Sequence, residues 1–132
     1  MIVDTSAIIS LLKEEPDSAP LSDVMLDHQP HLRISAANYL EAAIVIDANG
    51  DAPLSARLDE VMAFFGIEIE PVTGEHARIA RAAYRLYGKG NHPARLNFGD
   101  CFAYALAKST GEPLLFKGGD FAQTDVARAF PA

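Results

Sequence analysis

Short apolar runs alternate along this chain with longer stretches of helical periodicity. The runs at 1–4, 31–34, 67–70 and 114–116 are too short for helices, and their β-branched or alternating residues are typical of strands. Between them, apolar residues recur at spacings of three and four, as in helices that bury one face. Strands separated by helices predict an α/β fold, with a mostly parallel sheet covered by helices on both faces.

Capping residues and helix-terminating glycines predict where the helices begin and end. Asp17 and Ser35 are suited to N-terminal caps, and glycines follow most of the periodic segments. The expected helices are 5–13, 17–27, 35–49, 53–66, 73–87 and 99–110, with a short last helix capped by Thr124 or Asp125. No repeat or linker interrupts the pattern, so residues 1–132 are expected to form a single domain.

The composition restricts the class of protein further. A length of 132 residues with 49% apolar residues is enough for one domain with its own core. Cys101 is the single cysteine, so no internal disulfide can form, and the first residues lack the pattern of a secretory signal; both features favour the cytoplasm. The uncharged apolar runs, such as 42–46, are all far shorter than the roughly 20 residues of a membrane span.

Charge is distributed unevenly. The formal net charge of the chain is -7. Residues 76–111 contain six basic residues and one acid, Asp100, so this segment carries a net charge of +5, whereas the rest of the chain carries -12. A basic face of this kind would contact a phosphate backbone, although a merely solvated face has the same composition. Tyr84 and Tyr87 fit helix packing better than base stacking. The candidate RNA contacts are Arg78, Arg81, Arg85 and Arg95.

Acidic residues occupy positions where chemistry is expected. Asp4 follows the first predicted strand and Asp120 follows the last, and the carboxyl ends of parallel strands meet at one edge of the sheet. Glu41 lies in a helix so apolar that little of its surface is expected to face water, and burying a carboxylate costs several kcal/mol unless it is paired or protonated. Asp100 begins a helix of almost wholly apolar residues.

Each acid also has a purely structural interpretation. Asp4 and Asp100 could cap the helices that follow them, Glu41 could pair with an arginine, and Asp120 could be an ordinary turn residue. The combination favours a site, because four acids on separate elements would need a divalent cation to hold them together. Ligands that are all oxygen favour Mg²⁺ or Mn²⁺ over zinc.

Several motifs together resemble the PIN-domain nucleases, and within them the VapC toxins of bacterial type II toxin–antitoxin pairs. The order and spacing of the motifs match over the whole chain, and the last two motifs are the most specific. They are MIVDTSAII at the start, Asn38 with Glu41, NFGDCFAYALA at 97–107, and LLFKGGDF at 114–121 with Thr124 and Asp125. The resemblance implies a three-layer α/β/α PIN-like domain.

The resemblance also implies roles for individual residues. Asp4, Glu41, Asp100 and Asp120 match the family's catalytic acids, and three of these, Asp4, Asp100 and Asp120, match metal ligands. Two further matches are Ser6, a polar position that supports the site, and Asp125, an accessory acid of some members. The Gly118-Gly119 turn before Asp120 departs from the family, where another polar or acidic residue is common.

The implied activity is hydrolysis of RNA phosphodiester bonds with Mg²⁺ or Mn²⁺ as the cofactor. One or two ions are both compatible with the residues, with Glu41 and Asp120 binding a second ion or orienting water. The implied partners are the RNA substrate, a VapB-like antitoxin and a second copy of the chain in a homodimer. The antitoxin would bind in a groove between the helices at 35–49 and 53–66, although most of their apolar residues are expected to pack in the core.

Two other functions compete with this interpretation. In a phosphoacceptor receiver domain, 43–46 would be the central strand, Asp47 the phosphorylated residue and Lys117 its partner. Receivers carry an adjacent acid pair after the first strand, whereas Asp4 is followed by Thr5 and Ser6, and 35–49 is predicted to be one helix. The other alternative is a PIN-like module that only binds RNA or protein, against which the complete set of acids argues.

Overall fold

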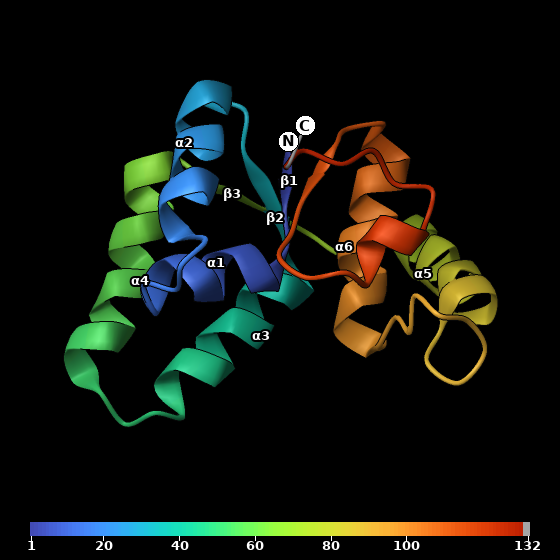
Figure 1. Cartoon of the computed structure of the whole chain (residues 1–132), viewed down its shortest axis with the longest axis horizontal. Coiled ribbons are helices and arrows are strands. Elements are labelled where there is room, and N and C mark those ends of the chain that lie inside the picture. The colour runs from blue at the N-terminus through green and yellow to red at the C-terminus, as the bar shows by residue number, and fades with distance from the viewer. Residues whose placement is uncertain (131–132) are drawn as a thin grey trace.

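The strands lie at the centre of the molecule in a computed structural model that describes residues 1–130 (Figure 1). They form one parallel sheet in the order β3-β2-β1-β4, which confirms the α/β prediction. Each strand is only two or three residues long, so the sheet contributes few backbone hydrogen bonds and depends on the helices around it. The strands are β1 (Ile2–Val3), β2 (Arg33–Ser35), β3 (Glu68–Glu70) and β4 (Leu114–Leu115).

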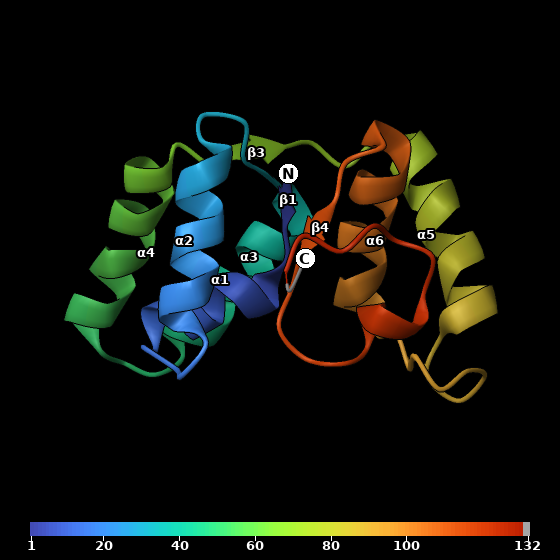
Figure 2. The same ribbon diagram turned by 45° about the horizontal axis from the view of Figure 1, so that its top comes forward.

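The helices form a layer on each side of the sheet (Figures 1 and 2). Four helices lie on one side and two on the other, which confirms the expected three-layer α/β/α arrangement. The first four are α1 (Thr5–Leu12), α2 (Ser18–His28), α3 (Ala36–Asp47) and α4 (Ala52–Phe65). The other two are α5 (Gly74–Tyr87) and α6 (Phe98–Thr110).

Two apolar cores pack against the opposite faces of the sheet. Successive side chains of a strand point to opposite faces, so Ile2 and Val3 enter different cores although they are neighbours in β1. Val3 packs with α1 to α4, and Ile2 packs with α5 and α6; both side chains are fully buried. Asp4 comes next in the chain and therefore lies at the edge of the sheet between the two cores.

The helix caps follow the sequence in part. Ser35 accepts a hydrogen bond from the first turn of α3, as expected, whereas Asp17 stands before α2 without a side-chain capping bond. Asp51 caps α4, which begins at Ala52 and not at Pro53, and Thr73 caps α5. Helix α6 begins at Phe98 and is capped by Asn97, whose side-chain oxygen accepts the Asp100 N–H at 2.9 Å. Asp100 is therefore not the cap, and instead occupies the third position of the helix.

The expected last helix is wrong. Phe121–Gln123 forms a short 3-10 helix, η1, and neither Thr124 nor Asp125 begins a helix within the residues described, which end at 130. The chain instead runs beside β4, where Leu114 N–H donates to Ala127 O at 2.8 Å and Ala129 N–H donates to Leu114 O at 3.0 Å. Backbone bonds to an edge strand thus replace those of a helix.

The receiver-domain alternative is also wrong, because 43–47 belongs to helix α3 and not to a central strand.

Helix α3 is less buried than its apolar composition predicted. Leu40 is 57% exposed and Ile44 is 59% exposed. Tyr84 on α5 is likewise exposed, whereas Tyr87 packs against Tyr104. Across residues 1–130, none of the helices combines the length and the apolar character needed to cross a membrane.

Candidate functional site

The site begins where β1 and β4, which are neighbours in the sheet, both end. Asp4 N–H donates to Leu115 O at 2.9 Å, which continues the strand pairing by one residue. Two residues after β4, the Lys117 N–H donates to Ser6 Oγ at 2.9 Å. The first turn of α1 is therefore tied directly to the segment that leads to Asp120.

Asp4 is a buried carboxylate with one oxygen held and the other without a partner. Its side chain is 3% exposed, and its Oδ2 accepts from Ser6 N at 3.0 Å and from Ser6 Oγ at 2.6 Å. These bonds confirm that Asp4 caps α1. Its Oδ1 is buried and accepts no hydrogen bond from residues 1–130. Burial raises the pKa of Asp4 to about 7, with the Ser6 bonds opposing the rise and the charges of Asp100 and Glu41 adding to it.

Asp100 is half-buried in the first turn of α6. Its Oδ2 accepts the Asn97 N–H at 3.0 Å, so Asp100 and Asn97 form a reciprocal capping box. Burial raises its pKa to about 6; the bond from Asn97 opposes this, while the charges of Asp120 and Glu41 raise the pKa further. Asp100 thus stabilises its helix and also faces the other acids.

Glu41 is held by neutral donors. Its Oε1 accepts from Thr5 Oγ1 at 2.6 Å and lies 3.4 Å from Asn38 Nδ2. The pairing with an arginine that the sequence left open is not among the ion pairs of residues 1–130. Its carboxylate also lies against the first turn of α6, where the backbone of Gly99 approaches it.

Asp120 is the most exposed of the four acids. It precedes η1 and makes no side-chain capping bond there, and it lies close enough to Asp100 for its charge to raise that pKa. Electrostatic interactions therefore link the four acids: Asp4 interacts with Asp100 and Glu41, and Asp100 also interacts with Glu41 and Asp120. The structure brings all four to the same edge of the sheet.

Two features of the acids suit a hard divalent cation. All their donor atoms are carboxylate oxygens, and the buried Oδ1 of Asp4 has no hydrogen-bond partner in the described residues. Within the part of the chain described, no three His, Cys, Asp or Glu side chains are spaced to hold one ion together. Mg²⁺ keeps several waters and usually takes one or two carboxylates from the protein, so a site built on two of these acids remains compatible with that ion. Oxygen donors without cysteine or histidine do not suit a structural zinc site.

Asp125 has partners of its own. It accepts from the Tyr104 hydroxyl at 2.6 Å and from Lys108 Nζ at 3.0 Å. The bond from Tyr104 is the main reason that its pKa lies below the usual value. These bonds attach the segment after η1 to α6, and a role for Asp125 as an accessory acid stays a prediction.

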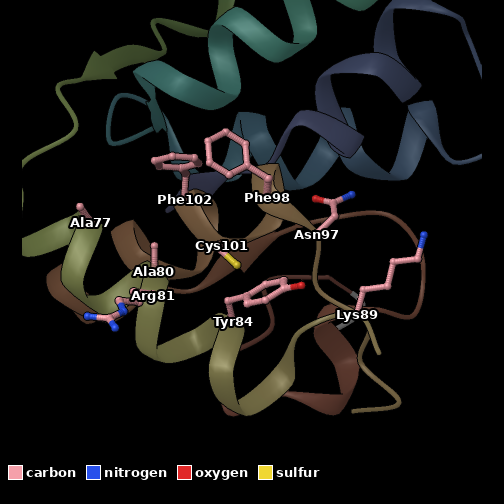
Figure 3. A pocket seen from close by; sticks show the side chains of 9 residues that line it. All are labelled: Ala77, Ala80, Arg81, Tyr84, Lys89, Asn97, Phe98, Cys101 and Phe102. Atoms are coloured by element: carbon pink, nitrogen blue, oxygen red, sulfur yellow. The ribbon is translucent and has the colours of Figure 1, made fainter. Parts of the chain in front are cut away.

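The candidate RNA-contacting arginines are all exposed. Three of them lie on α5, and Arg95 lies in the loop before α6 with a positive φ of 56°. Arg81 and Lys89 lie at the rim of an apolar cavity of about 610 Å³ between α5 and α6 (Figure 3). Arg81 and Lys89 therefore lie near the start of α6, and RNA binding by the four arginines stays a prediction.

Sequence reasoning did not identify what holds Glu41. Thr5, Asn38 and Gly99 all contact it or approach it closely. One signal was available: Asn38 is a polar residue three positions before Glu41 on a mostly apolar helix, a spacing that places both side chains on one face. The contribution of Gly99 depends on the approach of two distant helices and has no local signal.

The sequence model of the PIN domain matches residues 1–127. The chain is 52% identical over 130 residues to VapC ribonuclease Mb0625 of Mycobacterium bovis, covering 98% of this chain and 97% of that protein. It is 46% identical over 128 residues to ribonuclease VapC30 of Mycobacterium tuberculosis, covering 96% of each.

Two solved structures are similar in fold. The M. tuberculosis toxin VapC20, described as cleaving the sarcin-ricin loop, has a TM-score of 0.77 and 14% identity, covering 96% of this chain and 95% of that one. A toxin–antitoxin complex from Klebsiella pneumoniae has a TM-score of 0.72 and 18% identity, covering 99% and 98%. At these identities the likeness concerns the fold alone.

Proposed function

Because this chain belongs to the PIN domain family, we propose that it is a metal-dependent endoribonuclease, the toxin of a VapC-type toxin–antitoxin pair. The observation that carries the proposal is Asp4: a buried carboxylate with a raised pKa and an unpartnered oxygen, interacting with two further acids. A group of this kind is costly to keep unless it serves a reaction or binds a cation. The curated relatives, at 45–52% identity over nearly the whole chain, are named as ribonucleases.

Asp4 and Asp100 are the proposed direct ligands of Mg²⁺ or Mn²⁺. Asp120, the third acid that the sequence matched to a metal ligand, would act through a water molecule of the ion, because no three acids of the described residues are spaced to hold one ion directly. When bound, such an ion offsets charge on the phosphate and lowers the pKa of water. Ser6 holds Oδ2 of Asp4 and so leaves Oδ1 as the oxygen available to the ion. Glu41 is held through Oε1, which leaves Oε2 to orient a water molecule or to accept its proton.

Cleavage of labelled RNA by the purified chain tests this proposal, with Mg²⁺, with Mn²⁺ and with EDTA. Asp4→Asn and Asp100→Asn should each lower the rate at least about a hundredfold, while Asp23→Asn, which changes an exposed acid on α2, should cut like the wild type. Full activity of both site variants would refute the assignment. RNA binding without cleavage under any metal condition would instead indicate a PIN-like binding module.

Arg78, Arg81, Arg85 and Arg95 are proposed to contact the RNA backbone. Their exposure and the local excess of positive charge support this, because phosphate contacts are made mainly by accessible lysine and arginine side chains. The net charge of -7 over the chain would confine RNA to this face. We also propose the cytoplasm, where RNA is available, as the compartment, and residues 1–132 as one PIN domain.

A VapB-like antitoxin is the proposed protein partner. Leu58 and Phe65 on α4 are buried in the core, as expected for most apolar residues of these helices. Phe64 on α4 is exposed and remains available to a partner. The solved toxin–antitoxin complex with a similar fold supports a partner of this kind.

A homodimer is the second proposed assembly, formed through the face where α3, α5 and α6 meet. Phe98 is 79% exposed and lines two apolar cavities. One, of about 610 Å³, lies beside α5 (Figure 3), and the other, of about 630 Å³, lies beside α3. A protruding ring and apolar hollows on one face can match the same features of a second copy across a two-fold axis. Leu40 and Ile44 extend this apolar face along α3.

A further inference from the structure

Asn38 is a buried amide that connects two helices at the site. It lies on α3, is 0% exposed, and its Nδ2 donates to Gly99 O in the first turn of α6 at 2.9 Å. The same nitrogen lies 3.4 Å from Glu41 Oε1. A carbonyl and a carboxylate can only accept, so the nitrogen of the amide must face them. The Oδ1 of Asn38 is left without a partner among residues 1–130.

Gly99 allows the two helices to approach as closely as they do. A Cβ atom at this position would lie 2.2 Å from Glu41 Oε2 and 2.7 Å from Glu41 Cδ. The φ of Gly99 is outside the left-handed region, so the glycine is needed for space and not for an unusual backbone conformation. Any larger residue at this position would displace the Glu41 carboxylate.

Thr5 completes the set of contacts from a third element. It lies in the first turn of α1, directly after Asp4, and its Oγ1 is 2.6 Å from Glu41 Oε1 and 3.1 Å from Asn38 O. The residue next to one acid therefore holds another acid that is far away in the sequence. Thr5 and Asn38 both contact Oε1 of Glu41, and both side chains are uncharged.

We propose that Thr5, Asn38 and Gly99 form a latch that positions Glu41 relative to Asp100. The latch joins α1 and α3 to the first turn of α6, the turn that carries Asp100, and it keeps Glu41 Oε2 directed at the same space as the other acids. Thr5 and Asn38 are positioning residues that act through Glu41. This inference rests on the proposed nuclease function. It identifies three uncharged residues that this function would require.

The first test compares two glycine-to-alanine substitutions, each in the first turn of a helix. Gly99→Ala should weaken Mn²⁺ binding, measured by titration of the free ion by electron paramagnetic resonance, by about tenfold or more. It should lower kcat for RNA cleavage to a similar extent and change KM for RNA by less than about twofold. Gly74→Ala on α5 has only ordinary contacts around the new Cβ and should match the wild type in all three.

The second test changes the hydroxyl group of Thr5 and does not depend on how Gly99→Ala folds. Thr5→Val keeps the shape but removes the donor, and it should weaken Mn²⁺ binding and lower kcat about tenfold. Thr5→Ser keeps the donor and should restore both to within about threefold of the wild type. A role in packing alone would give the opposite order, because valine preserves the volume of threonine better than serine does.

The outcomes separate the latch from the nuclease function. Wild-type Mn²⁺ binding by both Gly99→Ala and Thr5→Val would overturn the latch, even if the wild type cuts RNA. Equal losses in Thr5→Val and Thr5→Ser would overturn the role of the hydroxyl group. A wild type that binds Mn²⁺ with the expected losses in the variants, yet cuts no RNA, would support the latch and overturn the nuclease function. Failure of the wild type to bind Mn²⁺ would overturn both.

Discussion

Ser6 Oγ donates a 2.6 Å hydrogen bond to Oδ2 of Asp4 and accepts, on the same oxygen, the backbone N–H of Lys117. One hydroxyl group therefore orients the most buried acid of the site and fixes the start of the segment that carries Asp120. The bond to Asp4 also favours its ionised form, in opposition to burial.

Ser6→Ala should destabilise the fold by about 1 kcal/mol and raise the pKa of Asp4 further above its usual value, since both hydrogen bonds are lost. Ser10→Ala is the matched control on the same helix. The Ser10 hydroxyl group is buried without a hydrogen-bond partner in the described chain, so its removal should leave stability unchanged or higher. Chemical denaturation gives both free energies, and carboxyl NMR titration gives the pKa. Equal destabilisation by the two variants would contradict this account.

Asp4→Asn should raise the melting temperature more at about pH 8 than at about pH 4. The pKa of Asp4 is about 7 in the folded protein against a usual 3.8, so between these values the folded state binds a proton that the unfolded chain has released. The free energy of unfolding therefore falls as the pH rises through this range, and asparagine removes that contribution. A pH series of thermal melts checks it, with Asp23→Asn as the control that shows no such trend.

Mg²⁺ should stabilise the wild type more at about pH 8 than at about pH 5. The pKa values of Asp4 and Asp100, about 7 and about 6, keep these carboxyls largely protonated at the lower pH, and protons compete with the ion for them. Stabilisation follows from preferential binding to the folded state. Thermal melts with and without the ion measure the shift. A shift that is the same at both pH values, or that persists in Asp100→Asn, would argue against binding at these acids.

Arg81→Glu combined with Arg85→Glu should weaken RNA binding, and the loss should be greater at low salt than at high salt. Contacts to phosphates release counterions, so their removal reduces the salt dependence of binding. Lys13→Glu combined with Arg57→Glu changes the net charge equally on the other side of the sheet and should have a much smaller effect. Filter binding or fluorescence anisotropy over a salt series gives both slopes. Equal effects of the two pairs of substitutions would indicate that the α5 arginines are ordinary solvent-exposed residues and do not contact RNA.

Ile44→Asp should shift the chain from dimer to monomer in sedimentation velocity, because it places a charge in the apolar face around Phe98. Leu86→Asp is the control, since Leu86 is as exposed as Ile44, at 59%, but lies on α5 outside the residues lining that cavity. A wild type that is monomeric at high concentration would refute the dimer. A dimer unaffected by Ile44→Asp would place the interface elsewhere.

Local signals predicted most of the fold, and they failed where two signals competed. The strands and caps such as Ser35 were identified because each depends on a few neighbouring residues. The start of α6 was misplaced because Asn97 and Asp100 can both cap, and the choice depends on which backbone N–H each accepts. The last helix was wrong because pairing with β4, a tertiary contact, replaced it.

The residues of the candidate site could likewise be predicted from the sequence only in part. Asp4 and Asp120 could be identified as strand-end acids, and all four acids through the family motifs. The surroundings of Glu41 could not, because Asn38 and Gly99 are 61 residues apart and meet only when α3 and α6 pack together. The exposure of Ile44 was likewise missed, since an apolar residue on a helix has the same periodicity whether it faces the core or a partner.

The placement of Ile2 and Val3 in different cores has a mechanical consequence. Glu41 is carried by the half of the molecule built on α1 to α4, and Asp100 by the half built on α5 and α6, so the acids meet across a seam between two separately packed bodies. A sheet of very short strands, the bond from Asn38 to Gly99 and the bond from Lys117 to Ser6 join the two halves near the acids. A small slip of one half against the other would pull the acids apart while both cores stayed intact, so this protein can lose its reactive geometry well before it loses its fold.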